Sequence, residues 1–143
     1  MTSKDIYDTV HKTISIPELV LRYIDTPEFQ RLRRIKQLGA AFYVYPTASH
    51  SRFEHSIGCG YLAHKLVTHL YDNQPELKIT KREIDLYQLA GTLHDIGHGP
   101  YSHVFEHITS QSHEDMSCNI IRHLHKRVGG MSISELEFVI NLI

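Results

Sequence analysis

Residues 84–93, IDLYQLAGTL, are apolar on nearly every side of a helix, and the chain cannot continue that helix through Gly97, Gly99 and Pro100. A segment of this kind is typical of the middle of a helical bundle, because a helix without a polar face must be covered all round. The sequence therefore predicts a helical core around this segment. The residues that directly follow Leu93 are therefore expected to lie at the end of a buried helix.

A second helix is predicted from the residues that begin and end it. Thr26, Pro27 and Glu28 have the residue types of an N-cap, a first helical position and an acidic first turn. Gly39 ends that segment. The residues expected to face inward are Phe29, Leu32, Ile35 and Leu38. The longer strand candidate, AAFYVYP at 40–46, is short and ends at a proline, so a sheet has little to build on.

Two capping-box spacings predict where the long helices begin. They are Ser51 with Glu54 and Thr80 with Glu83. The first precedes helical periodicity over residues 53–71, which stops before Pro75 and is carried by Leu62, Leu66 and Leu70. Two further helices are expected, from about 113 to 127 and from Ser134 onward to Ile143. These patterns predict a single all-α domain over residues 1–143.

Composition and charge limit the kind of protein. The chain has 143 residues, 41% of them hydrophobic, which suits one domain that folds without disulfides. Its two cysteines, Cys59 and Cys118, form no CxxC pair, and no apolar run approaches the roughly 20 residues of a spanning helix. We expect an intracellular protein of the cytoplasm or nucleus without a membrane partner. A net charge of −1 gives no reason to expect nucleic acid as the main partner.

The residues after the central helix are rich in metal-binding groups. The stretch LHDIGHGPYSH, residues 93–103, contains three histidines and an aspartate that core packing does not require. His94 and Asp95 are adjacent, and mixed nitrogen and oxygen ligands suit a divalent metal ion (Mn, Fe, Ni, Zn or Mg). His55, one turn inside the preceding long helix, is available as a third ligand. From the residues alone, the alternative stays open that His94 is a core histidine hydrogen-bonded to Asp95.

Two longer blocks carry a family resemblance. SRFEHSIGCGYLAH at 51–64, followed by LAGTLHDIGHGPYSHVFE at 89–106, resembles the HD-domain phosphohydrolases. Within them the likeness is to deoxynucleoside triphosphate triphosphohydrolases with a sterile alpha motif domain ahead of the HD domain, and it covers almost the whole chain. The resemblance implies a helical HD-domain bundle. It also implies hydrolysis of a dNTP at the α-phosphorus, with release of a deoxynucleoside and triphosphate.

The resemblance implies roles for individual residues. It matches three residues to metal ligands: His55, His94 and Asp95. It matches four to catalytic positions: His98, His103, His113 and Glu106, the last standing where close relatives have aspartate. It matches Arg52 to a phosphate contact, and Gln37 and Leu38 to residues lining the sugar. In each case the alternative is a surface or packing role.

A basic segment, IDTPEFQRLRRIK at 24–36, is read by composition alone as a solvated helix face. The resemblance instead matches Asp25, Gln30 and Arg33 to residues that read guanine at an activating nucleotide site between subunits. An aspartate and an arginine offer the acceptor and donor pattern that guanine edges require. The resemblance therefore implies GTP or dGTP as an activator.

One ligand of the family is missing from the pattern. The fourth metal ligand is an aspartate on a helix well downstream of His113, and neither Glu135 nor Glu137 is a convincing substitute. We therefore expect an HD domain truncated at its C-terminus, weak or inactive alone, that forms homo-oligomers or pairs with a full-length relative. The alternative function is a non-catalytic HD-fold protein that binds a nucleotide or a partner through an incomplete metal site.

Overall fold

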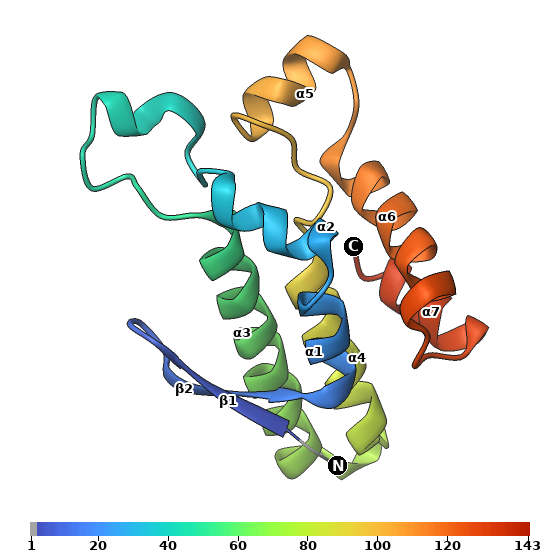
Figure 1. Ribbon diagram of the computed structural model, residues 1–143. Coiled ribbons are helices and arrows are strands. Elements are labelled where there is room, and N and C mark those ends of the chain that lie inside the picture. Colours follow the sequence, from blue (N-terminus) through green and yellow to red (C-terminus); the bar gives the residue numbers. More distant parts are fainter. Residues whose placement is uncertain (1–2) are drawn as a thin grey trace.

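The central apolar segment forms helix α4, Lys81–Leu93, which packs along the long helix α3, Arg52–Asn73. The computed structural model describes residues 3–143 and shows these two helices side by side and antiparallel (Figure 1). Glycine allows their close approach, since a Cβ added at Gly60 would lie 2.1 Å from the Thr92 hydroxyl oxygen. The start of α3 and the end of α4 therefore meet at one end of the helix pair.

Shorter helices surround this pair. They are α1 Glu18–Ile24, α2 Pro27–Gln30, α5 His103–Thr109, α6 His113–Val128 and α7 Ile133–Ile140, with the 3₁₀ helices η1 Arg31–Arg34, η2 Gly39–Tyr43 and η3 Pro75–Leu77. Tyr23, Phe29 and Leu89 are completely buried in the apolar core between them. The predicted helical class is confirmed. Within residues 3–143, no helix is both long and apolar enough to cross a membrane.

An antiparallel β-hairpin precedes the helices. Strand β1, Ser3–Asp8, pairs with β2, Lys12–Pro17, in a register that places Ile6 opposite Ile14. Ile14 is completely buried, because alternate residues of a strand share one face and this face lies on the helices. The prediction of a purely helical domain is therefore wrong in this detail. The alternating isoleucines of residues 6–16 are the pattern that signals the hairpin.

The chain after Thr26 is less helical than predicted. Thr26 caps α2 as expected, through a hydrogen bond from the Phe29 amide. The expected continuation to Gly39 is wrong, since α2 passes directly into the short η1 and the chain then turns. Leu38, expected to face inward, is 53% exposed. The segment 40–46 forms no strand, as expected, because η2 occupies most of it.

The remaining helix predictions are largely confirmed. Both capping boxes are present, in the pairs Ser51 with Glu54 and Thr80 with Glu83. The cap of α7 is Ser132 rather than Ser134, and that helix ends at Ile140. Leu62 and Leu66 lie on the solvent side of α3, not on its core side. Helix α5 follows no predicted pattern, because none of its described residues is buried and no apolar period marks it.

Candidate metal centre

The predicted metal ligands lie where the start of α3 meets the end of α4. His55 is in the first turn of α3, and His94 and Asp95 directly follow α4. Asp95 Oδ2 lies 3.3 Å from His55 Nε2, and Asp95 Oδ1 lies 3.3 Å from His94 Nε2. Two ligands that bind one ion at about 2.1 Å, with an angle of roughly 100° between them, are about 3.2 Å apart. Each histidine nitrogen therefore has the spacing of a neighbouring metal ligand from one oxygen of Asp95.

Hydrogen bonding determines which nitrogen of His94 faces Asp95. His94 Nδ1 lies 2.8 Å from the Gly91 carbonyl oxygen, and a carbonyl can only accept, so Nδ1 carries the proton. In the neutral ring, Nε2 then presents a lone pair to a carboxylate oxygen that also has only lone pairs. A cation between the two atoms replaces this repulsion by attraction. The backbone holds the far nitrogen as proteins commonly do for a metal-binding histidine, so this donor set fits a divalent ion.

Arg52 is buried together with Asp95. Its Nη1 atom donates to Asp95 Oδ2 at 2.5 Å, and its Nε atom donates to the Ser102 hydroxyl at 2.9 Å. Burial by itself raises the pKa of Asp95, but the neighbouring His98, His94 and Arg52 outweigh it and hold the pKa well below its usual range. Asp95 is therefore ionised at neutral pH. The phosphate contact expected of Arg52 stays a prediction, because here its guanidinium binds other protein groups.

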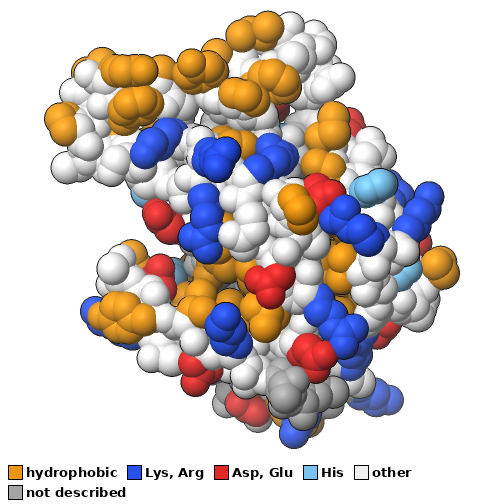
Figure 2. Space-filling view, in the orientation of Figure 1, with side chains coloured by type: hydrophobic (Ala, Val, Ile, Leu, Met, Phe, Trp, Pro, Cys, Tyr) orange, Lys and Arg blue, Asp and Glu red, His pale blue; other side chains and the backbone are white. Residues whose placement is uncertain are grey.

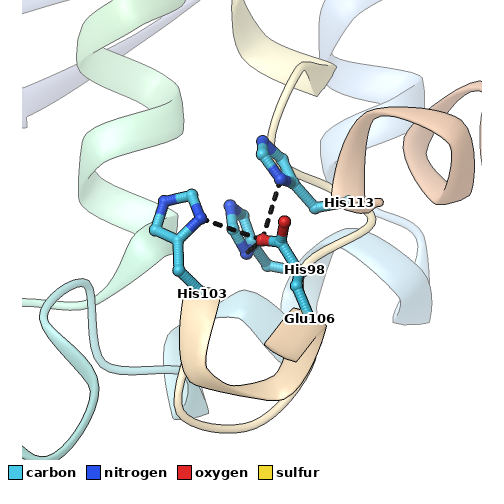
Figure 3. Close-up of side chains that lie close together, drawn as sticks. All are labelled: His98, His103, Glu106 and His113. Atoms are coloured by element: carbon cyan, nitrogen blue, oxygen red, sulfur yellow. Dashed lines mark hydrogen bonds and ion pairs between the residues drawn. The ribbon is translucent and has the colours of Figure 1, made fainter. Parts of the chain in front are cut away.

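Figure 3 shows a second group of ionisable side chains, two of which, His98 and His113, lie within 4.0 Å of Asp95. Its members are His98 in the loop after α4, His103 and Glu106 on α5, and His113 at the start of α6. Glu106 Oε1 lies 2.9 Å from Nδ1 of both His103 and His113, and 3.7 Å from Nδ1 of His98. One carboxylate oxygen thus faces three imidazoles. The structure brings together the four residues expected to be catalytic, and their roles stay predictions.

His98 is the buried member of this group. Its ring stacks on that of His113, with centroids 3.9 Å apart. Burial, opposed by Asp95, lowers the pKa of His98, so its ring is neutral at neutral pH. Within the described part of the chain, neither ring nitrogen makes a hydrogen bond of normal geometry, although Nε2 lies 3.3 Å from Asp95 Oδ1. A buried imidazole with unused nitrogens is available to bind a substrate oxygen or water.

Ser117 attaches α6 to the site, and no pattern in the sequence marks it. Its hydroxyl donates to the His94 carbonyl at 2.7 Å and accepts from the Gly97 amide at 2.8 Å. A Cβ added at Gly97 would lie 2.2 Å from the His113 carbonyl oxygen, so only glycine allows this approach. These contacts place His113 within reach of Glu106.

The residues expected to line the sugar lie in the turn after η1. The Gln37 carbonyl accepts from Arg52 Nη2 at 3.4 Å, whereas the Leu38 side chain is exposed. Ser102 ties this turn to the loop after α4, because its hydroxyl donates to the Lys36 carbonyl at 2.7 Å. Gln37 is therefore beside the site. The sugar contacts of both residues stay predictions.

Cys59 also reaches the site, one turn after His55 on α3. Its Sγ atom lies 3.5 Å from His55 Nε2, and ligand atoms of Cys59, His55 and His94 all lie within 4.8 Å of one another. Burial, and then the charge of Asp95, raise the pKa of the Cys59 thiol. The signal that points to Cys59 is its four-residue spacing from a candidate ligand histidine, not a CxxC pattern.

The residues expected to read guanine line a separate cavity of about 350 Å³ between the β-hairpin and α3. Asp25, Gln30 and Arg33 share its wall with Lys4 and Phe53. Arg33 Nε donates to Gln30 Oε1 at 2.8 Å, and the guanidinium lies 3.5 Å from the centre of the Phe53 ring. Figure 2 shows basic side chains beside an apolar hollow on this face. The structure brings the three residues together, and nucleotide binding stays a prediction.

Known proteins resemble the chain over this region. The HD-domain family model matches residues 52–143. The chain is 57% identical over 105 residues to deoxynucleoside triphosphate triphosphohydrolase SAMHD1 of Bos taurus, a match that covers 73% of the chain and 18% of that protein. It is 46% identical over 127 residues to the SAMHD1 homolog of Dictyostelium discoideum, covering 84% of the chain and 25% of that protein. An uncharacterised protein of Methanocaldococcus jannaschii is 41% identical over 122 residues, covering 85% of the chain and 25% of that protein. The chain thus spans 18% to 25% of the length of these three curated relatives.

Proposed function

Because the chain belongs to the HD-domain family, we propose that it acts as a metal-dependent deoxynucleoside triphosphate triphosphohydrolase. In this reaction a water oxygen bonds to the α-phosphorus of a dNTP, and the bond from that phosphorus to the sugar oxygen breaks. The products are a deoxynucleoside and triphosphate, as the names of the SAMHD1 relatives imply. The observation that carries the proposal is the convergence of two histidine nitrogens on the two oxygens of Asp95.

The residues around Asp95 suit the first half of this reaction. A divalent ion held by His55, His94 and Asp95 would acidify a water molecule and neutralise phosphate charge. The hydrogen bond from Arg52 fixes the orientation of the Asp95 carboxylate. His98, with a nitrogen 3.3 Å from Asp95 and no competing hydrogen bond among the described residues, binds and orients a phosphate oxygen or the attacking water.

We assign His103 to the proton transfer to the departing sugar oxygen. Its side chain is 63% exposed, and its Nδ1 atom lies 2.9 Å from Glu106 Oε1, which leaves Nε2 for the substrate. Glu106 is one methylene longer than the aspartate expected at this position. Its reach lets the same oxygen contact both His103 and His113, so the change to glutamate keeps a carboxylate partner for His103.

We also propose that GTP or dGTP binds as an activator in the cavity lined by Asp25, Gln30 and Arg33. A carboxylate and a guanidinium suit the donor and acceptor edges of guanine, and Lys4 on the same wall suits a phosphate. Since such a site lies between subunits in the family, the proposal includes self-association of the chain. Its place of action is proposed to be the cytoplasm or nucleus.

A product assay under single-turnover conditions tests the proposed reaction. The chain is incubated in excess over dGTP with Mn²⁺, and products are separated by ion-exchange chromatography. We expect weak release of deoxyguanosine and intact triphosphate in equal amounts, abolished by His94→Ala and unchanged by His123→Ala, which alters an exposed histidine on α6. Release of pyrophosphate or single phosphates contradicts the proposed bond cleavage. Binding of dGTP without any product supports the non-catalytic alternative.

A further inference from the structure

Cys59 brings a sulfur atom to the metal centre from the same face of α3 as His55. The two residues are four apart, so their side chains are neighbours on the helix surface. The Cys59 thiol is free of any disulfide within the described residues. Its sulfur lies within 4.8 Å of a ligand nitrogen of His94, on the neighbouring helix end. The thiol is therefore close to two separate candidate ligands.

The spacing fits a ligand set that contains sulfur. Zn²⁺ binds a thiolate at about 2.3 Å and an imidazole at about 2.0–2.1 Å, and with tetrahedral angles the two ligand atoms are about 3.5 Å apart. The distance from Cys59 Sγ to His55 Nε2 is 3.5 Å. The sulfur also lies 3.7 Å from His55 Nδ1, and His55 Nε2 lies 3.3 Å from Asp95 Oδ2, so Nε2 is close to both the thiol and the carboxylate.

A cavity gives solvent access to this side of the centre. It has a volume of about 460 Å³ and lies between the tip of the β-hairpin and the first turns of α3. Both His55 and Cys59 line it, and the side chain of His55 is 34% exposed. A metal ion can therefore reach Cys59 without any opening of the core.

We propose that Cys59 is a further ligand of the metal centre, which gives a donor set of two imidazoles, one thiolate and one carboxylate. On metal binding, the thiol proton is released to solvent and a sulfur–metal bond forms. A thiolate ligand favours Zn²⁺ and Co²⁺ over Mg²⁺ and Mn²⁺, because soft sulfur binds the harder ions poorly. The inference rests on the proposed metal centre, and it adds that the centre prefers Zn²⁺ or Co²⁺ to Mg²⁺ and Mn²⁺.

Cobalt spectroscopy of the whole chain tests this ligand directly. Co²⁺ bound through a thiolate gives a sulfur-to-cobalt charge-transfer band in the near ultraviolet, while its visible bands report cobalt bound by any ligands. We expect the charge-transfer band and the visible bands in the unaltered chain. Cys59→Ser should lose the charge-transfer band and keep visible bands, and Cys118→Ser, which alters the other free cysteine, should keep both. His94→Ala should lose both.

The possible outcomes distinguish failure of the Cys59 ligand from failure of the whole metal centre. Visible bands without a charge-transfer band in the unaltered chain, or a charge-transfer band that survives Cys59→Ser, overturn the ligand and leave the metal centre intact. No cobalt binding at all overturns both. In zinc titrations we expect Cys59→Ser to lower affinity by about tenfold or more, with a smaller change for Mn²⁺.

Alkylation of the unaltered chain provides a test that needs no cysteine variant. Iodoacetamide labelling is followed by peptide mass spectrometry, with and without Zn²⁺. Both cysteines are partly exposed, so Cys118 is an internal control. We expect Zn²⁺ to slow labelling of Cys59 and not of Cys118, and the protection to disappear in His94→Ala. Equal labelling rates of Cys59 with and without bound Zn²⁺ contradict the proposal.

Discussion

Arg52 Nη1 and Asp95 Oδ2 form an ion pair at 2.5 Å, and the two side chains are only 2% and 5% exposed. Removing one member of a buried pair leaves an uncompensated charge, which typically costs about 3–5 kcal/mol. We therefore expect Arg52→Ala to lower the free energy of unfolding by about that amount, measured by urea denaturation. Arg22→Ala, which breaks an exposed pair with Glu18, should cost at most about 1 kcal/mol. Equal small losses for both variants contradict the structural role of Arg52.

Gly97→Ala should destabilise the chain and separate the site residues. The added methyl would lie 2.2 Å from the His113 carbonyl oxygen and 2.4 Å from the Ser117 amide, and backbone atoms cannot easily move away. We expect a loss of about 2 kcal/mol or more in the free energy of unfolding. Gly58→Ala is the matched control, because its methyl meets only the His11 side chain, 3.1 Å from Nε2, and no backbone atom. That substitution, inside α3, should be neutral or stabilising by up to about 1 kcal/mol.

The double variant His94→Ala with Asp95→Asn should lose bound metal. Asparagine keeps the size of Asp95 and a hydrogen-bond acceptor for Arg52, but it leaves the buried Arg52 charge uncompensated and so destabilises the fold. Elemental analysis of protein equilibrated with Mn, Fe, Ni or Zn measures the effect, and circular dichroism checks the fold. We expect the unaltered chain and His123→Ala to bind metal. Equal metal content in the double variant would falsify the site assignment.

Acid should remove a stabilising contact between α4 and α7. Arg82 Nε donates to Glu135 Oε1 at 2.6 Å, and this bond, together with the hydrogen bond from the Ser132 amide, lowers the pKa of Glu135 from 4.5 to about 2. A carboxyl group with a lowered pKa stabilises the fold above its unfolded value, and the contribution disappears as pH falls from about 4.5 toward 2. Since the pair is partly exposed, we expect Glu135→Gln to cost about 1 kcal/mol at pH 6. Urea denaturation at pH 6 and pH 2 should show this difference shrinking toward zero at the lower pH.

The cavity beside the β-hairpin should distinguish guanine from adenine. Calorimetry with GTP and ATP is expected to show tighter binding of GTP, and Arg33→Ala should remove that preference. Arg34→Ala is the matched control, since Arg34 is exposed and does not line the cavity. Equal affinities that fall together with added salt would indicate an ordinary basic surface.

The parts of the fold that the sequence predicted are those encoded by neighbouring residues. Capping boxes act within one turn, so Ser51 and Thr80 correctly marked the starts of α3 and α4. His55 and His94 lie close together as expected, because both occupy the joined end of one helix pair. The β-hairpin was missed because its strands show only a short alternation.

Other parts of the site depend on contacts that no local pattern encodes. Ser117 is an ordinary helix serine until folding places its hydroxyl between Gly97 and His94. Cys59 has a local signal in its spacing from His55, but its closeness to His94 exists only once α3 packs on α4. Leu62 and Leu66 have the period of a core face, yet they face solvent because glycine, with no side chain, makes the close contact with α4.

Helix α5 has no buried residue, and this sets how the site responds to local opening. A segment with few core contacts can unfold while the rest of the domain stays intact. Amide hydrogens of residues 103–109 should therefore exchange with solvent through frequent local opening, and those in the middle of α4 only through global unfolding. Each opening carries His103 and Glu106 away while His55, His94 and Asp95 keep their places on the α3–α4 pair. The proposed metal binding and the proposed proton transfer thus depend on two units of different stability, and mild denaturant should abolish proton transfer before metal binding.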